Sequence, residues 1–250
     1  MKQIKLLFFL ASASVTGAFA QSNGLTDMSQ SRYAKMANTG IDAVHWTNGF
    51  WGERFNVFSG TSLQSMWNTW NTPEVSHGFR NFEIAAGVCK GEHWGPPFHD
   101  GDMYKWMEGV ASVYAVNKDP ELDKLMDNFI ACVVKAQRAD GYIHTPVVIE
   151  ELNKGIDSHT LADSQQQTVI GTKVGSEDEK GAFANRLNFE TYNLGHLMMA
   201  GIVHHRATGK TTLLDAAVKA TDFLCHFYET ASAELARNAI CPSHYMGVVE

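Results

Sequence analysis

The stretch HDGDMYKWMEGVASVYAVNKDPELDKLMDNFIACVVKAQ, residues 99–137, decides the fold of this 250-residue chain. Apolar side chains recur at helical spacing on both sides of a short polar turn. They are Met103, Trp106, Met107, Val110, Val113 and Tyr114, then Leu122, Leu125, Met126, Phe129, Ile130 and Val133. Asp119-Pro120 begins the second helix, because Asp caps an N-terminus and Pro fits the first helical position. The stretch predicts two antiparallel helices.

A second pair of helices resembles the first. The helical pattern returns at Glu190, breaks at Thr208-Gly209-Lys210, and continues from Thr211 to about Tyr228. A shift of 92 (199 − 107) aligns Met107 with Met199, Gly109 with Gly201 and Leu122 with Leu214. Repeated hairpins bury their apolar stripes on one another, in an open solenoid or a closed ring. We predict an all-α fold built from antiparallel helical hairpins.

The segments around these hairpins have less regular patterns. Residues 21–40 are polar and predict an N-terminal arm, and residues 41–58 predict an extended piece, a turn and a helix beginning near Trp51. Gly and Pro predict a loop over 87–101, and residues 145–188 hold a polar stretch expected to be a surface insertion. The final SHYMGVVE begins an apolar helical pattern without a stop signal, which favours a truncated chain over a naturally short last helix.

Residues 1–20 have the features of a secretory signal peptide. Lys2 and Lys5 precede an apolar run, and Ala18-Phe19-Ala20 supplies the small-residue cleavage pattern before Gln21. The run is too short to span a bilayer, although a retained anchor is the alternative. We therefore expect export, to the periplasm or the extracellular space, and no membrane span elsewhere in the chain.

The net charge argues against some classes of binding partner, and the positions of the cysteines predict the state of their thiols. The net charge is −7, and removing two leader lysines gives −9 (−7 − 2). An acidic chain without a basic run is a poor partner for nucleic acid or anionic lipid. The four cysteines are widely spaced, and the helical positions of Cys132 and Cys225 predict buried free thiols.

Two stretches concentrate residues that could bind a ligand. In the first stretch, Asp100 and Asp102 could cap a helix. Alternatively, they could form a sugar-binding rim, because carboxylates accept hydrogen bonds from hydroxyl groups and indoles stack on sugar rings. The other residues of that rim would be Lys105, Trp106 and Glu108. The loop before it adds aromatic and imidazole groups, where binding residues often lie. These are His93, Trp94, Phe98 and His99.

The second stretch is NFETYNLGHLMMAG, residues 188–201. Tyr192 and His196 are one helical turn apart, close to Glu190. A histidine on an apolar helix is commonly a hydrogen-bonded core residue, so a structural role and a pocket role both stay open. His204-His205, at the far end of this helix, are expected to be solvated cations.

The ordered motifs resemble a known enzyme family. FWGER (50–54), DGDMYKWMEG (100–109), AQRADGY (136–142) and ETYNLGHLMMAG (190–201) followed by ATGKTTLLDAA are similar to the β-L-arabinofuranosidases of glycoside hydrolase family 127 and relatives such as family 146. The resemblance runs from about residue 41 to the end. It implies that 41–250 are the N-terminal part of an (α/α)6-barrel catalytic domain that removes terminal arabinofuranose from plant glycans, with arabinose-containing oligo- or polysaccharides as partners.

The same resemblance implies chemistry that these 250 residues do not carry. The family uses a zinc-bound cysteine as nucleophile, from a Glu-x-Cys element and a Cys-Cys pair, and neither pattern occurs here. We therefore expect the catalytic residues and the zinc ligands beyond Glu250, and no metal ligands in this chain. The resemblance carries over substrate-binding roles to Asp100, Asp102, Lys105, Trp106, Glu108, Glu190, Tyr192 and His196, with His244 as a further candidate.

One departure bears on the substrate. The family often has His-Glu-x-Tyr where this chain has Phe189-Glu190-Thr191-Tyr192, which removes an imidazole that would contact sugar. Two other readings stay open. One is a different α/α-barrel carbohydrate enzyme that needs no zinc, such as an unsaturated uronyl hydrolase or a polysaccharide lyase. The other is a carbohydrate-binding protein without catalysis.

Overall fold

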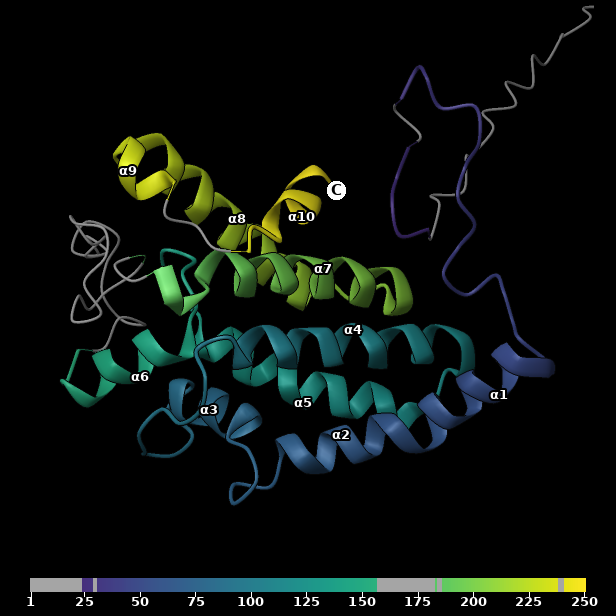
Figure 1. Cartoon of the computed structure of the whole chain (residues 1–250), viewed down its shortest axis with the longest axis horizontal. Helices are drawn as coiled ribbons and strands as arrows, with labels where there is room; N and C mark the ends of the chain where they lie inside the picture. Colours follow the sequence, from purple (N-terminus) through teal and green to yellow (C-terminus); the bar gives the residue numbers. More distant parts are fainter. Residues whose placement is uncertain (1–23, 29–30, 157–182, 184–185, 238–240) are drawn as a thin grey trace, which may run out of the picture.

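The computed structural model describes residues 24–28, 31–156, 183, 186–237 and 241–250, and within them every regular element is a helix (Figure 1). The elements are α1 (Gly49–Val57), the π-helix η1 (Phe58–Ser62), α2 (Leu63–Trp70), α3 (Gly78–Ala85), α4 (His99–Asn117), α5 (Pro120–Ala136), α6 (Thr145–Asn153), the 3-10 helix η2 (Arg186–Asn188), α7 (Glu190–Thr208), α8 (Thr212–Thr230), α9 (Ala233–Ala236) and α10 (His244–Val249). The predicted all-α class is confirmed.

The first helical element is longer than its sequence pattern. Phe58 and Leu63, at the two junctions, both have right-handed helical backbone angles, so α1, η1 and α2 continue into one another. The predicted helix near Trp51 is confirmed, but its continuation through α2 was not predicted. The Ser-Gly-Thr-Ser segment at 59–62 has low helix propensity, which hides the continuation in the sequence.

The two predicted hairpins are α4–α5 and α7–α8, with α4 and α7 lying side by side (Figure 1). The helices α5 and α8 begin after the N-caps Asp119 and Thr211, which are 92 residues apart (211 − 119) as the repeat predicts. The Asp119 carboxylate accepts a hydrogen bond from the Glu121 N–H at 2.9 Å, which confirms the predicted cap. The first helices of the two hairpins, α4 and α7, both have 19 residues.

Polar contacts join the two hairpins at their turns. The Lys118 ammonium donates to the Ala207 carbonyl at 3.0 Å, between the C-terminal ends of α4 and α7. The Lys210 ammonium lies 2.7 Å from a carboxylate oxygen of Asp123 and 2.8 Å from one of Asp127. These exposed ion pairs contribute little stability each, but they keep the two turns in register.

The core between α3 and the first hairpin, α4–α5, is aromatic. Phe129 of α5 is fully buried, and its ring centroid lies 5.0 Å from that of Phe82 and 6.2 Å from that of Tyr104. Trp106 packs edge-on against the same Phe129 ring at 6.4 Å. Such clusters combine large buried areas with favourable edge-to-face geometry, so they fix how α3, α4 and α5 sit together.

Several expectations from the sequence were wrong. The predicted loop 87–101 ends at residue 98, α4 begins at His99, and α3 was not predicted at all. The predicted polar insertion begins with a helix, α6, because Val147, Val148 and Ile149 are buried against the core. Residues 157–182 of that insertion, like the predicted leader 1–20, lie outside the described residues.

Two predictions about single residues were also wrong. Cys225 is exposed rather than buried, because the buried row of α8 runs through Phe223, Leu224 and Phe227 and leaves position 225 on the opposite face. His204 is fully buried rather than solvated, and neither ring nitrogen finds a hydrogen-bond partner among the described residues. Burial lowers the pKa of His204 to about 4, so the ring is neutral at pH 7.

Candidate functional site

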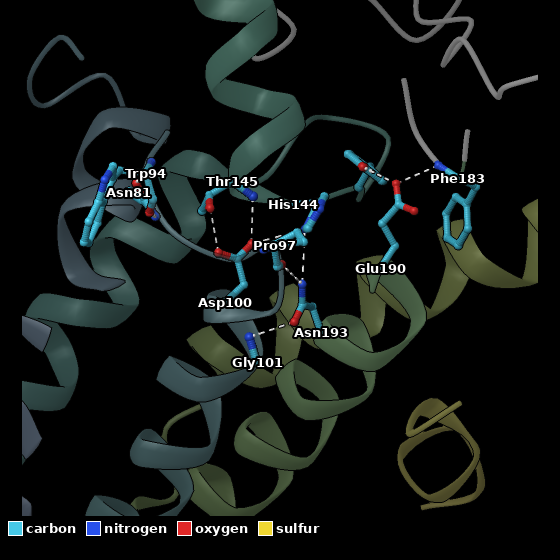
Figure 2. Close-up of polar contacts among 11 residues, drawn as sticks. Asn81, Trp94, Pro97, Asp100, Gly101, His144, Thr145, Phe183, Glu190 and Asn193 are labelled. Atoms are coloured by element: carbon cyan, nitrogen blue, oxygen red, sulfur yellow. Dashed lines mark hydrogen bonds and ion pairs between the residues drawn. The ribbon is translucent and has the colours of Figure 1, made fainter. Parts of the chain in front are cut away.

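The N-terminal ends of α4 and α7 are joined by one buried amide (Figure 2). The Asn193 Oδ1 accepts from the Gly101 N–H at 2.9 Å, and its Nδ2 donates to the Pro97 carbonyl at 2.9 Å. Gly101 permits this approach, since an added Cβ would lie 2.6 Å from the Tyr192 ring and 2.7 Å from Asn193 Oδ1. The two contact residues, Gly101 and Asn193, are themselves 92 positions apart.

Asp100 lies in the same buried network. Its carboxylate accepts from the Thr145 hydroxyl at 2.6 Å and the Thr145 N–H at 2.7 Å, and lies 3.5 Å from His144 Nδ1. Burial raises the pKa of Asp100, but the His144 and Thr145 contacts lower it more, so the carboxylate is charged. Asp100 neither caps α4 nor reaches solvent; it fixes the start of α6 against α4.

Glu190 is the second buried carboxylate at this end. It accepts from the Tyr142 hydroxyl at 2.8 Å and from the Phe183 N–H at 2.6 Å. Burial raises its pKa above the ordinary value, opposed by His144 and by these two hydrogen bonds. Like Asp100, Glu190 positions backbone around the site, because its side chain is enclosed by protein.

Three of the predicted residues lie on the open face between α4 and α7. The Lys105 ammonium is 2.9 Å from a carboxylate oxygen of Asp102 and donates a hydrogen bond to the Tyr192 hydroxyl. Burial lowers the pKa of Lys105, but the bonds to Tyr192 and Asp102 raise it more, so the net shift is upward and the amine stays charged. One cation thereby bridges the two helices.

Two further predicted residues, Glu108 of α4 and His196 of α7, face each other about one helical turn beyond Lys105 and Tyr192. His196 Nδ1 and a carboxylate oxygen of Glu108 are 3.6 Å apart, and neither atom has a hydrogen-bond partner among the described residues. The Tyr192 ring packs edge-on against His196, with centroids 4.6 Å apart. We call Asp102, Lys105, Glu108, Tyr192 and His196 the polar row. Both atoms are buried against each other, and each keeps a hydrogen-bonding capacity that the described residues leave unused.

Trp106 and His244 do not belong to this face. The Trp106 side chain is 2% exposed, stacks on Trp67 at 4.9 Å and donates its indole N–H to the Leu63 carbonyl at 3.3 Å. Its predicted role as a sugar-stacking ring is therefore wrong, because protein covers the indole. His244 is buried at the start of α10 and stacks on Tyr228 at 5.7 Å.

Imidazoles that were not assigned to the site border the buried network. Burial lowers the pKa of His93 to about 4 and that of His99 below its ordinary value, although Asp100 raises both. His144 is fully buried, and its Nδ1 lies 3.2 Å from the Asn193 amide nitrogen. The loop composition pointed to His93 and His99, whereas His144, just before the predicted insertion 145–188, was not singled out in the sequence.

The described residues do not fit the zinc that the resemblance implies. No group of three or more His, Cys, Asp or Glu side chains within the described part of the chain could hold a metal ion. All four cysteines are free, and burial raises the pKa of Cys89 and Cys132, which favours the thiol over the metal-binding thiolate. No catalytic step is assigned to a metal here.

Comparison with known proteins identifies the family to which the chain belongs. The sequence model for the β-L-arabinofuranosidase GH127 catalytic domain matches residues 43–250. A non-reducing end β-L-arabinofuranosidase from Bifidobacterium longum subsp. longum is 32% identical over 149 residues. That alignment covers 60% of this chain and 19% of the relative, so the chain spans about a fifth of the relative's length.

Similar solved structures support the same family assignment. A structure described as a glycoside hydrolase is 70% identical, with a TM-score of 0.60, covering 92% of this chain and 26% of the other. A GH127 β-L-arabinofuranosidase from Geobacillus stearothermophilus T6 is 31% identical, with a TM-score of 0.57, covering 72% of this chain and 25% of the other. The predicted fold, part of an α/α barrel, is confirmed. The chain belongs to glycoside hydrolase family 127, as part of its catalytic domain.

Proposed function

We propose that this chain is part of an exported glycoside hydrolase that removes β-L-arabinofuranose from the non-reducing ends of plant glycans. Family membership supports hydrolysis of a glycoside, and the name of the Bifidobacterium relative supports the sugar. Export is supported by the leader pattern of residues 1–20. No helix among the described residues is long and apolar enough to cross a membrane.

The polar row is the observation that carries the proposal. Its five side chains supply a cation, two carboxylates, a phenol and an imidazole on facing turns of α4 and α7. In the structure the facing atoms of Glu108 and His196 are buried, so a sugar hydroxyl would enter after the two side chains separate, and it would then donate to the carboxylate and contact the imidazole. Lys105 is held between Asp102 and Tyr192, so it can donate to a ring or hydroxyl oxygen without losing its position.

The buried network gives the polar row its rigidity. Asn193 joins the backbone of α4 to the start of α7, and Asp100 joins α4 to α6. Catalytic and binding groups must be held within fractions of an ångström, and buried hydrogen bonds behind them provide that support. We assign Asp100 and Glu190 this positioning role rather than contact with the sugar.

The nucleophilic cysteine and the zinc ligands are proposed to follow Glu250 in the complete protein. The span of this chain, a fifth to a quarter of its relatives, supports that placement. The acidic net charge of −7 is compatible with a neutral glycan as partner. The residues described here would then bind and orient the terminal sugar while the following arc supplies the reacting groups.

The test uses the protein expressed from its complete reading frame. Release of L-arabinose from a β-L-arabinofuranosyl disaccharide is expected, with kcat/KM falling about ten- to a hundredfold in Glu108→Gln, because a charged hydrogen bond contributes roughly 1.5–3 kcal/mol. The matched control is Glu121→Gln, an exposed glutamate on α5, which is expected to leave the kinetics unchanged.

Three results would contradict the proposal. The first is an absence of arabinose release together with cleavage of another glycan. The second is activity that survives removal of zinc by a chelator, which favours a uronyl hydrolase or a polysaccharide lyase. The third is sugar affinity by calorimetry without turnover of any glycan, which identifies a carbohydrate-binding protein.

A further inference from the structure

Trp94, in the loop between α3 and α4, exposes its indole although its backbone is bonded to the core. Its side chain is 51% exposed. The fully buried Asn81 amide donates to the Trp94 carbonyl at 3.0 Å and accepts from the Trp94 N–H at 3.2 Å (Figure 2). The exposure is therefore built into the backbone of the loop, because both backbone polar groups of Trp94 are bonded to a residue in the core.

The indole is also supported from one side. The His77 ring packs against it, with centroids 4.9 Å apart and planes inclined at 51°. Support on one side and exposure on the other leave a rigid apolar surface for a planar or ring-shaped ligand. An indole presented in this way loses little conformational entropy when a ligand binds.

The surroundings of Trp94 identify the ligand class. His93, the preceding residue, lies near enough to Asp100 and His144 to interact electrostatically with both. Its Nε2 is buried and finds no hydrogen-bond partner among the described residues, and the same holds for Nε2 of the fully buried His144. The half-exposed indole, supported by His77, matches the apolar C–H face of a sugar ring.

We infer that Trp94 is a stacking platform for the glycan residue that follows the terminal sugar. This inference rests on the proposed function, because the polar row is taken to bind the terminal arabinofuranose. The Nε2 atom of His93 is buried while the neighbouring indole is half exposed, so Trp94 lies at the surface beside a histidine of the buried network. The platform would therefore set the preference for oligosaccharides over simple arabinofuranosides.

A matched control is present in the chain. Trp46 is 50% exposed and packs against Phe55, with ring centroids 5.7 Å apart. It lines a cavity with Val113 and Val116, in the C-terminal half of α4. A general effect of removing an exposed indole would appear equally in Trp46→Ala and Trp94→Ala.

The experiment compares two substrates of the complete protein: a β-L-arabinofuranosyl disaccharide and methyl β-L-arabinofuranoside. In Trp94→Ala we expect KM for the disaccharide to rise about three- to tenfold, from the loss of a stacking contact, with kcat unchanged. Kinetics on the methyl glycoside should not change, Trp46→Ala should match wild type on both substrates, and Trp94→Phe should recover part of the loss. Thermal unfolding midpoints verify that the variants fold.

The outcomes separate this inference from the proposed function. Equal losses on both substrates, or no loss on either, would overturn the platform while leaving the arabinofuranosidase assignment intact. If no arabinofuranoside is cleaved, the platform is tested instead by calorimetry, which measures the binding of a panel of plant oligosaccharides to the two variants. Weaker binding in Trp94→Ala than in Trp46→Ala supports the platform for another glycan, and equal or absent binding overturns it.

Discussion

Replacing Asn193 by alanine tests how the two hairpins are held together. The substitution removes the acceptor of the Gly101 N–H and the donor to the Pro97 carbonyl, both at 2.9 Å. A buried backbone group left without a partner costs about 1–3 kcal/mol, so we expect a local loss of about 2–5 kcal/mol. In contrast, Asn128→Ala on the exposed face of α5 should change stability by about 0.5 kcal/mol or less.

Hydrogen exchange at the first turns of α4 measures this loss directly. The Gly101 amide is protected through Asn193, so a loss of 2 kcal/mol or more should speed its exchange at least about thirtyfold in Asn193→Ala. Amides in the middle of α5 serve as an internal reference. If Gly101 exchanged at the wild-type rate in Asn193→Ala, or as fast in Asn128→Ala, the amide would not be what joins α4 to α7.

The remaining predictions concern the core and its pH dependence. Phe129→Ala should destabilise the domain by about 3–5 kcal/mol in urea unfolding, since it empties a fully buried aromatic cluster, and a loss below 1 kcal/mol would contradict that packing. His204 has a pKa of about 4 in the fold, against 6.5 ordinarily, because of burial and then the Lys210 charge. The unfolded chain takes up this proton first, so stability present above pH 6.5 should fall by about 3 kcal/mol as the pH drops to 4. His204→Leu should remove that part of the pH dependence, and an unchanged profile would refute it.

Local patterns in the sequence were enough to predict the two helical hairpins. The periodic apolar residues of α4 and α5, the Asp119 cap and the 92-residue repeat all describe interactions between neighbours in the chain, and the structure retains them. The helices that were not predicted, α2, α3 and α6, lack such signals. The buried face of α6, for example, is only Val147, Val148 and Ile149 beside polar residues, and the core decides its burial.

The candidate site was harder to predict from the sequence than the hairpins, because the exposure of each side chain depends on tertiary packing. Asp100 and Asp102 are equally good sugar ligands by chemistry, but Thr145 encloses the first and leaves the second on the open face. Trp106 and Trp94 were both noted in the sequence, yet Trp67 covers the former while Asn81 holds the latter at the surface. No spacing rule distinguishes these pairs, since their partners lie far away in the sequence.

The central claim is that the polar row between α4 and α7 binds the terminal sugar, and a crystal structure of the complete protein with L-arabinose tests it most directly. We predict sugar hydroxyls within hydrogen-bonding distance of Glu108 and His196, with Asp100 and Glu190 still enclosed behind them. Arabinose bound elsewhere, without contact to Glu108 or His196, would contradict the account.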